Sequence, residues 1–92
     1  MVFSGTTSSN ASSAFFTSPA EIVSYSLVNN SGGNLTITAG MLYGSTVTLF
    51  YSGVIAANSS FEYTGGNIIV LGDYRIIVTT SGASCDYYFS IK

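Results

Sequence analysis

Hydrophobic and polar residues alternate with a period of two along most of the chain after residue 20. This period is typical of β-strands whose two faces have different surroundings, and no stretch shows the 3.6-residue period of a helix. Clusters of glycine, asparagine and serine separate the alternating stretches, as turns do between antiparallel strands. The pattern predicts about eight short strands. The clearest are residues 21–29, 35–39, 46–51, 61–63, 68–71, 74–80 and 87–91.

Strict alternation also assigns a face to each side chain within a strand. The side chains predicted to share a face are Val23, Tyr25 and Leu27 in one strand, Val47, Leu49 and Tyr51 in a second, and Phe61 and Tyr63 in a third.

The turn signals predict how the strands are connected. The cluster at residues 29–34 predicts a hairpin between the strands on either side of it, and residues 81–84 predict a hairpin between the last two strands. Residues 52–53 predict a tight turn, and residues 40–44 a loop with apolar residues in it. Strand number and turn density together predict an all-β protein, an antiparallel β-sandwich of jelly-roll or Ig-like type.

The first eighteen residues have a different composition, dominated by serine, threonine, glycine and asparagine. Such a segment buries too little apolar surface to order itself in isolation. We therefore expect residues 1–18 to form an extended arm and residues 19–92 the sandwich domain, with Pro19 at the boundary. The alternative is a frayed terminus in which Phe15 and Phe16 form a first edge strand.

Charge is scarce, because aspartate, glutamate, lysine and arginine make up only 7% of the chain. The two cations, Arg75 and Lys92, form no basic cluster, so we expect no nucleic-acid partner and no electrostatic attachment to a membrane. No stretch approaches the roughly 20 apolar residues of a membrane span. A low net charge and many aromatic residues favour a subunit of a homo-oligomeric assembly.

Residues capable of catalysis are few. The chain has no histidine, and its hydroxyl groups lack a basic partner that could activate them as nucleophiles. One carboxylate pair is conceivable for glycoside hydrolysis, Glu62 with Asp73 or Asp86. The single cysteine, Cys85, is expected to be a small buried residue. We predict a protein that is not an enzyme and uses no metal or other cofactor.

The aromatic and apolar residues outside the regular strands are the candidate contacts with other subunits. Three belong to the predicted arm and three to the apolar stretch in the predicted loop. These predicted interface residues are Phe3, Phe15, Phe16, Met41, Leu42 and Tyr43.

Three segments carry a resemblance to a known family. Residues 55–62 read Ile-Ala-Ala-Asn-Ser-Ser-Phe-Glu, residues 71–76 read Leu-Gly-Asp-Tyr-Arg-Ile, and a tyrosine-rich strand follows at residues 87–91. In this pattern the sequence resembles small virion proteins of tailed bacteriophages. The resemblance covers about residues 21–91.

That resemblance implies a structural protein located in the virion, either a capsid decoration protein or a part of the tail and its fibres. Its partners would be the major capsid protein or other virion subunits, and it would act as a homo-oligomer, with a trimer as one option. The family offers no catalytic residues to transfer to this chain.

Two other functions stay open. One is a carbohydrate- or receptor-binding module that presents exposed aromatic rings, for which Tyr74, Tyr87 and Tyr88 are the candidates. The other is a subunit of a secreted bacterial filament, in which copies donate an edge strand to one another.

Overall fold

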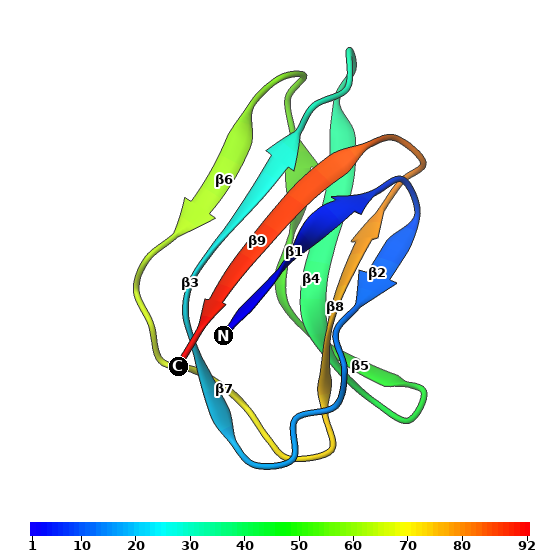
Figure 1. The fold of residues 1–92 in the computed structure, drawn as a ribbon. Helices are drawn as coiled ribbons and strands as arrows, with labels where there is room; N and C mark the ends of the chain where they lie inside the picture. Colours follow the sequence, from blue (N-terminus) through cyan, green and yellow to red (C-terminus); the bar gives the residue numbers. More distant parts are fainter.

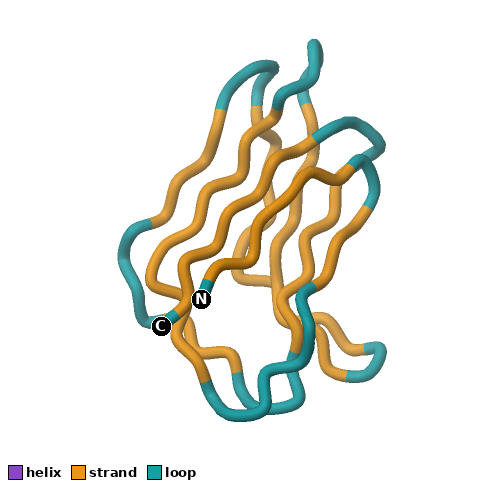
Figure 2. The backbone as a smooth tube through the Cα atoms, viewed as in Figure 1, coloured by secondary structure: helices purple, strands orange, loops and turns teal.

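A computed structural model describes all 92 residues. They form nine β-strands joined by turns and loops, and no helix (Figures 1 and 2). Because the chain has no helix, none is available to cross a membrane. The strands are β1 (Val2–Thr7), β2 (Asn10–Ser12), β3 (Ala20–Asn29), β4 (Leu35–Tyr43), β5 (Thr46–Ile55), β6 (Ser60–Tyr63), β7 (Ile68–Val70), β8 (Arg75–Thr80) and β9 (Cys85–Ile91).

The strands form two antiparallel sheets that lie one behind the other in Figure 1. Sheet A has the order β1-β9-β3-β6, and sheet B has the order β2-β8-β4-β5. The short strand β7 also pairs with β3, beyond the end of β6. Since β9 occupies the other side of β3, β6 and β7 together act as one interrupted edge strand of sheet A.

The strand pairs are nested around a single turn. The first strand pairs with the last, β2 pairs with β8, β3 pairs with β6 and β7, and β4 pairs with β5. The chain is thus one long antiparallel hairpin whose tip lies at Gly44 and Ser45. The hairpin wraps so that β9 also pairs with β3, and β8 with β4. This arrangement is a jelly roll. The predicted β-sandwich is confirmed, and its topology is not the Ig-like alternative.

The prediction of a separate arm at residues 1–18 is wrong. Strand β1 pairs with β9 along its whole length, and β2 pairs with β8, so this segment supplies an edge strand to each sheet. Its composition gives it little apolar surface of its own. The ladders to β9 and β8 order it instead, because they satisfy its backbone groups and bury the few apolar side chains that it has.

The predicted hairpins at residues 29–34 and 81–84 are also wrong, because each connects strands in different sheets. A turn signal shows that the chain reverses, but not whether the strands beside it pair. The only hairpin between sequence neighbours joins β4 and β5, where a loop was predicted at residues 40–44. Strand β5 then continues through the turn predicted at residues 52–53.

Two β-bulges change the predicted faces. In β3 a register shift lies between Ile22 and Ser24, so that Ile22 is fully buried and Val23 is 37% exposed. In the β4–β5 pair a shift opposite Gly40 leaves Phe50 as the extra residue of β5. Side chains before Phe50 therefore have the opposite alternation from those after it, because a bulge inserts one residue into a period of two.

The core between the sheets is rich in aromatic rings. Tyr25 is 4% exposed, and its ring lies 5.2 Å from that of Phe89 and 5.4 Å from that of Phe50, between ring centroids. Such separations are favourable for aromatic pairs. Cys85 is fully buried and free, which confirms the prediction that it packs as a small core residue.

One fully buried side chain in this core region is polar, that of Asn29. Its Nδ2 donates to the carbonyl oxygens of Gly33 and Ile55, both at 2.8 Å, and to that of Ala56 at 3.2 Å. Its Oδ1 accepts from the backbone N–H of Ser31 at 2.9 Å and from its hydroxyl at 2.6 Å. Asn29 thus ties the β3–β4 connection to the end of β5.

Candidate docking surface

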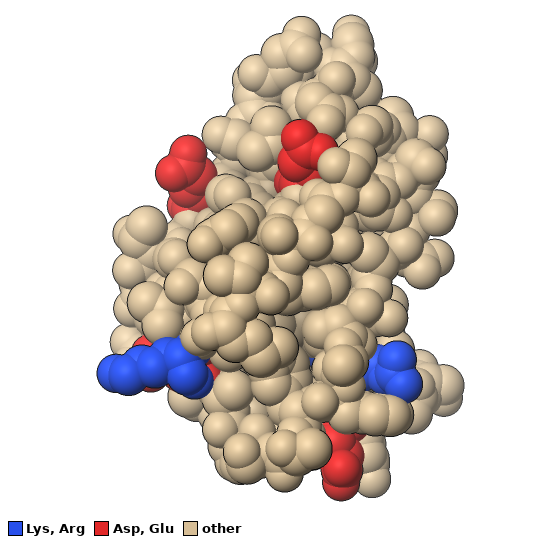
Figure 3. Space-filling view, viewed as in Figure 1, with Lys and Arg blue, Asp and Glu red and all other residues tan.

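The outward face of sheet A is polar at its centre and has exposed apolar residues elsewhere, namely Val2, Val23 and Ile69. One row of residues across its four strands reads Ser4, Tyr88, Ser26 and Glu62. Tyr88 is 47% exposed and is the one large aromatic in that row. Figure 3 shows this side of the molecule, where charged side chains are few.

The outward face of sheet B is divided into a polar half and an apolar half. In the polar half, one row across the sheet reads Asn10, Thr79, Thr38 and Ser52, and the one exposed apolar residue beyond it is Val54. The row two residues further along reads Ser12, Ile77, Gly40 and Leu49, and the next reads Arg75, Leu42 and Val47. We call the four apolar side chains of these last two rows the sheet B patch; they are Leu42, Val47, Leu49 and Ile77.

The patch is exposed chiefly along β5. Val47 is 44% exposed and Leu49 is 50% exposed, whereas Leu42 and Ile77 are half-buried. Gly40 provides the space that Leu49 occupies, because a Cβ atom at Gly40 would lie 3.1 Å from Leu49 Cδ2 and only 2.6 Å from the carbonyl oxygen of Thr48. Leu49 on the edge strand β5 therefore lies against Gly40 of the neighbouring strand β4.

An aromatic residue and a cation lie beside the patch. Phe15, in the connection from β2 to β3, is 58% exposed. The guanidinium carbon of Arg75 lies 3.9 Å from the centroid of its ring, a cation–π contact. Arg75 shares a row with Leu42 and Val47, so one side of the patch is bordered by a single positive charge.

The six predicted interface residues are divided between surface and interior. Phe15 and Leu42 lie at the patch, and Tyr43 is 53% exposed near the hairpin tip, with its ring 5.0 Å from that of Tyr74. The other three face inward: Phe3 and Met41 pack against the core, and Phe16 is 6% exposed.

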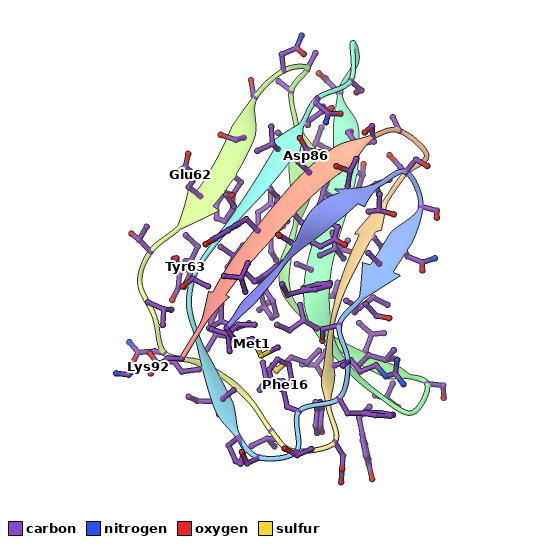
Figure 4. The ribbon with its side chains drawn as sticks, in the orientation of Figure 1. Met1, Phe16, Glu62, Tyr63, Asp86 and Lys92 are labelled. Carbon is purple, nitrogen blue, oxygen red and sulfur yellow. The ribbon has the colours of Figure 1, made fainter.

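The prediction that Phe16 is an interface contact is therefore wrong for the folded chain. The backbone carbonyl of Phe16 accepts a 2.7 Å hydrogen bond from the N–H of Asp73, and its own N–H donates to the carbonyl of Tyr74 at 3.0 Å. These bonds hold Phe16 against the β7–β8 connection, with its ring directed into the sandwich (Figure 4).

Val47, Leu49 and Ile77 were not predicted as contacts, and strict alternation had placed Tyr51 on the same face as Val47 and Leu49. The bulge at Phe50 is the reason for the difference, since Tyr51 turns inward and its ring packs 4.4 Å from that of Phe61. An unusually apolar strand without charge was the one signal in the sequence that could have pointed to this surface.

The three candidate tyrosines of a carbohydrate site do not lie together. Tyr87 and Tyr88 are neighbours in β9 and therefore point to opposite sides of sheet A. Tyr87 faces Phe3, with 4.8 Å between ring centroids, and Tyr88 faces outward. Tyr74 stacks on Tyr43 in the connection that precedes β8.

The acidic side chains are also dispersed. Glu62 and Asp86 lie on different strands of sheet A (Figure 4), and no three cysteine, aspartate or glutamate side chains are close enough to hold a metal ion together. Glu21 accepts a 3.1 Å hydrogen bond from the N–H of Asn67, and Asp86 accepts one of 2.5 Å from the hydroxyl of Thr6. These two carboxylates thus connect neighbouring parts of sheet A.

Two groups have a perturbed pKa. Burial raises the pKa of Tyr25 from 10.0 to about 12, with further increases from the nearby hydroxyls of Tyr51 and Tyr63. Burial also raises the pKa of the Cys85 thiol above its usual value. Both shifts favour the neutral form, so neither side chain is poised as a nucleophile or base near neutral pH.

A hollow of about 330 Å³ lies beside the two termini. Met1, Phe16 and Lys92, which line it, lie in the same region of Figure 4. Its walls are about equally polar and apolar and include Phe15, Phe16 and Ile91 together with Met1 and Lys92. The Met1 nitrogen is occupied by a 2.9 Å hydrogen bond to the Ile91 carbonyl. No set of converging polar side chains accompanies the hollow, so the sheet B patch is the stronger candidate site.

Comparison with known proteins adds a likeness of fold. A crystal structure of PirA is similar to this chain with a TM-score of 0.55 and 14% sequence identity, over 97% of this chain and 93% of that chain. At this identity the similarity concerns the fold alone. No protein-family model matches the sequence, and no curated protein matches it.

Proposed function

We propose that this chain is a non-enzymatic structural protein of a virus particle, a capsid decoration protein that attaches through the sheet B patch. The observation that carries the proposal is the division of one sheet face into a polar half and an apolar half. A contiguous apolar area on a small domain with few charges is typical of a surface that contacts another protein. The resemblance of the sequence to phage virion proteins suggests which kind of partner to test.

The strength of one such contact can be estimated from the exposed fractions. Full burial of a valine or leucine side chain contributes about 1.5–3 kcal/mol, so a half-exposed one contributes roughly 1 kcal/mol. Val47 and Leu49 then give roughly 2 kcal/mol, and the less exposed Leu42 and Ile77 bring the total to roughly 3 kcal/mol, below the roughly 4–15 kcal/mol lost as translational and rotational freedom on association. One patch alone is thus too weak for firm attachment. Attachment through several patches in one oligomer would overcome this limit.

The test is made on particles from the virus or prophage whose genome encodes the chain. Quantitative mass spectrometry of gradient-purified particles should find the chain in a fixed ratio to the major capsid protein. Immunogold labelling should place it on the capsid surface, whereas labelling confined to the tail would favour the tail-associated alternative. Absence of the chain from purified particles would refute the proposal.

The role of the patch is tested by adding purified protein back to particles that lack it. Leu49→Asp places a charge in the apolar half and should abolish saturable binding. Thr79→Asp makes the same charge change on an exposed residue in the polar half of the same face, and should leave binding intact. Equal binding by the two variants would show that another surface makes the contact.

The carbohydrate-binding alternative has less support, because its three candidate tyrosines lie apart. A glycan array with the wild-type chain and Tyr88→Ala tests it directly. Binding that disappears with Tyr88→Ala would favour this alternative over the decoration role.

A further inference from the structure

The two sheets have four edges, and three of them are poor templates for another strand. Strand β2 has only three residues, and the edge made by β6 and β7 is interrupted between Tyr63 and Ile68. Strand β1 has six residues and carries Gly5 at its centre. Native proteins commonly keep edge strands short or interrupted in this way, which hinders pairing with another chain.

Strand β5 is different. It has ten residues, pairs with β4 on one side only, and contains no proline and no charged residue. Its first four residues, Thr46 to Leu49, are all exposed. The one irregularity is the bulge at Phe50, which leaves the residues on either side of it out of phase. A partner strand in register with one half of β5 is therefore out of register with the other half.

We propose that β5 pairs with β5 of a second copy of this chain, antiparallel and about a two-fold axis, through the residues before the bulge. An isologous contact needs a surface that is complementary to itself. A neutral edge strand meets this requirement, because its backbone donors and acceptors match those of its own copy and no like charges face each other. The two copies of sheet B then form one continuous sheet of eight strands.

The pleat restricts the register. A two-fold axis perpendicular to the sheet keeps outward side chains outward, so Val47 and Leu49 can face only Val47 or Leu49 of the partner. An axis through Thr48 places Thr48 opposite its own copy and Val47 opposite Leu49 of the partner. This register places both exposed apolar side chains of β5 opposite an apolar side chain, whereas an axis through Val47 would leave Leu49 opposite the hairpin turn.

The one charge on the strands of sheet B stays far from its copy in this dimer. Arg75 lies on β8. In the dimer, the strand order β8-β4-β5 is followed by β5-β4-β8 of the partner, so five strand spacings separate the two arginines. At about 4.8 Å per spacing the separation is roughly 24 Å, beyond the screening length of about 8 Å at physiological salt. Repulsion between the two Arg75 side chains therefore does not oppose the pairing.

Pairing also joins the two sheet B patches. The row that ends in Leu49 continues into Val47 and Leu42 of the partner, so the dimer presents one apolar area with twice the number of side chains on one face. This consequence rests on the proposed function, since it supplies the multiple attachment that a single weak patch needs. The pairing itself does not depend on what the patch binds.

Cysteine cross-linking tests both the pairing and its register. Val47→Cys, Thr48→Cys and Leu49→Cys are compared with Thr79→Cys, which is exposed on a central strand of the same sheet. Cys85 is fully buried and serves as the internal background. Directly opposed residues of an antiparallel pair have Cα atoms about 4.5–5.5 Å apart, within the range for a disulfide. Residues two places out of register do not reach that range.

The expected result is fast disulfide-linked dimer from Thr48→Cys, with little from the other three variants. Light scattering should give twice the 9.6 kDa chain mass for the wild type, and the monomer mass for folded Thr48→Lys, with circular dichroism verifying the fold. A wild-type monomer without selective cross-linking, or preferential linking of Thr79→Cys, would overturn the pairing. A stable dimer that fails to bind particles would instead refute the proposed function and leave the pairing intact.

Discussion

Replacement of Asn29 by alanine should be among the most destabilising single substitutions in this chain. The side chain is fully buried and makes hydrogen bonds to Gly33, Ile55, Ala56 and Ser31. Hydrogen bonds contribute about 0.5–1.5 kcal/mol each, and a buried polar group left without a partner costs about 1–3 kcal/mol. Loss of four or more bonds therefore predicts a decrease of roughly 3–4 kcal/mol in the free energy of unfolding. That is a large share of the roughly 5–15 kcal/mol typical of a domain.

The measurement is urea unfolding followed by far-ultraviolet circular dichroism, because the chain has no tryptophan. Asn30→Ala is the matched control, since Asn30 is the next residue, is exposed and makes no side-chain hydrogen bond. Its effect should lie within about 0.5 kcal/mol, as for most surface substitutions. A decrease below about 1 kcal/mol for Asn29→Ala, or equal effects of the two variants, would refute the role assigned to Asn29.

Asn29→Asp refines the same test through its pH dependence. A carboxylate in this position faces three carbonyl oxygens, so the ionised form is disfavoured and the pKa in the folded state rises above the unfolded value of about 3.9. The variant should be most stable below about pH 3.9 and should lose stability as pH rises through the folded-state pKa. Stability that increases with pH over that interval would contradict the orientation of the amide.

Three further outcomes are expected. Gly40→Ala should lower stability by about 1–3 kcal/mol, because its Cβ would lie 2.6 Å from the Thr48 carbonyl oxygen, whereas Gly33→Ala has open space and should be nearly neutral in the same urea titration. Between pH 10 and 12 the buried Tyr25 hydroxyl, whose pKa is raised to about 12, stays protonated while the unfolded chain ionises. Stability should fall there by about 1.4 kcal/mol per pH unit, and Tyr25→Phe should remove that part of the slope in alkaline unfolding curves. Deletion of residues 1–18 should unfold the domain, as seen by circular dichroism, because it removes β1, β2 and the buried Phe16; a folded truncated chain would contradict this.

The candidate surface could be predicted only in part. Phe15 and Leu42 were expected as contacts and do lie at the sheet B patch. They were chosen because they are apolar residues outside the predicted strands. Val47 and Leu49 were expected to share a face with Tyr51, and the bulge at Phe50 separates them. Phe16 was expected to contact another subunit as part of the predicted arm, but backbone hydrogen bonds to the β7–β8 connection hold it in the core.

The sequence alone determined the class of the fold, since the period-two alternation, the turn residues and the lack of a helical period are all local properties. It also determined that the surface would carry few charges. The tertiary structure decided which strands pair, which connections cross between sheets, and where the two bulges reverse the faces. These features depend on contacts between residues far apart in the chain, and a strand's local pattern is compatible with many partners and registers. Residues 1–18, a polar segment expected to be an arm, instead supply an edge strand to each sheet, because β1 pairs with β9 and β2 pairs with β8.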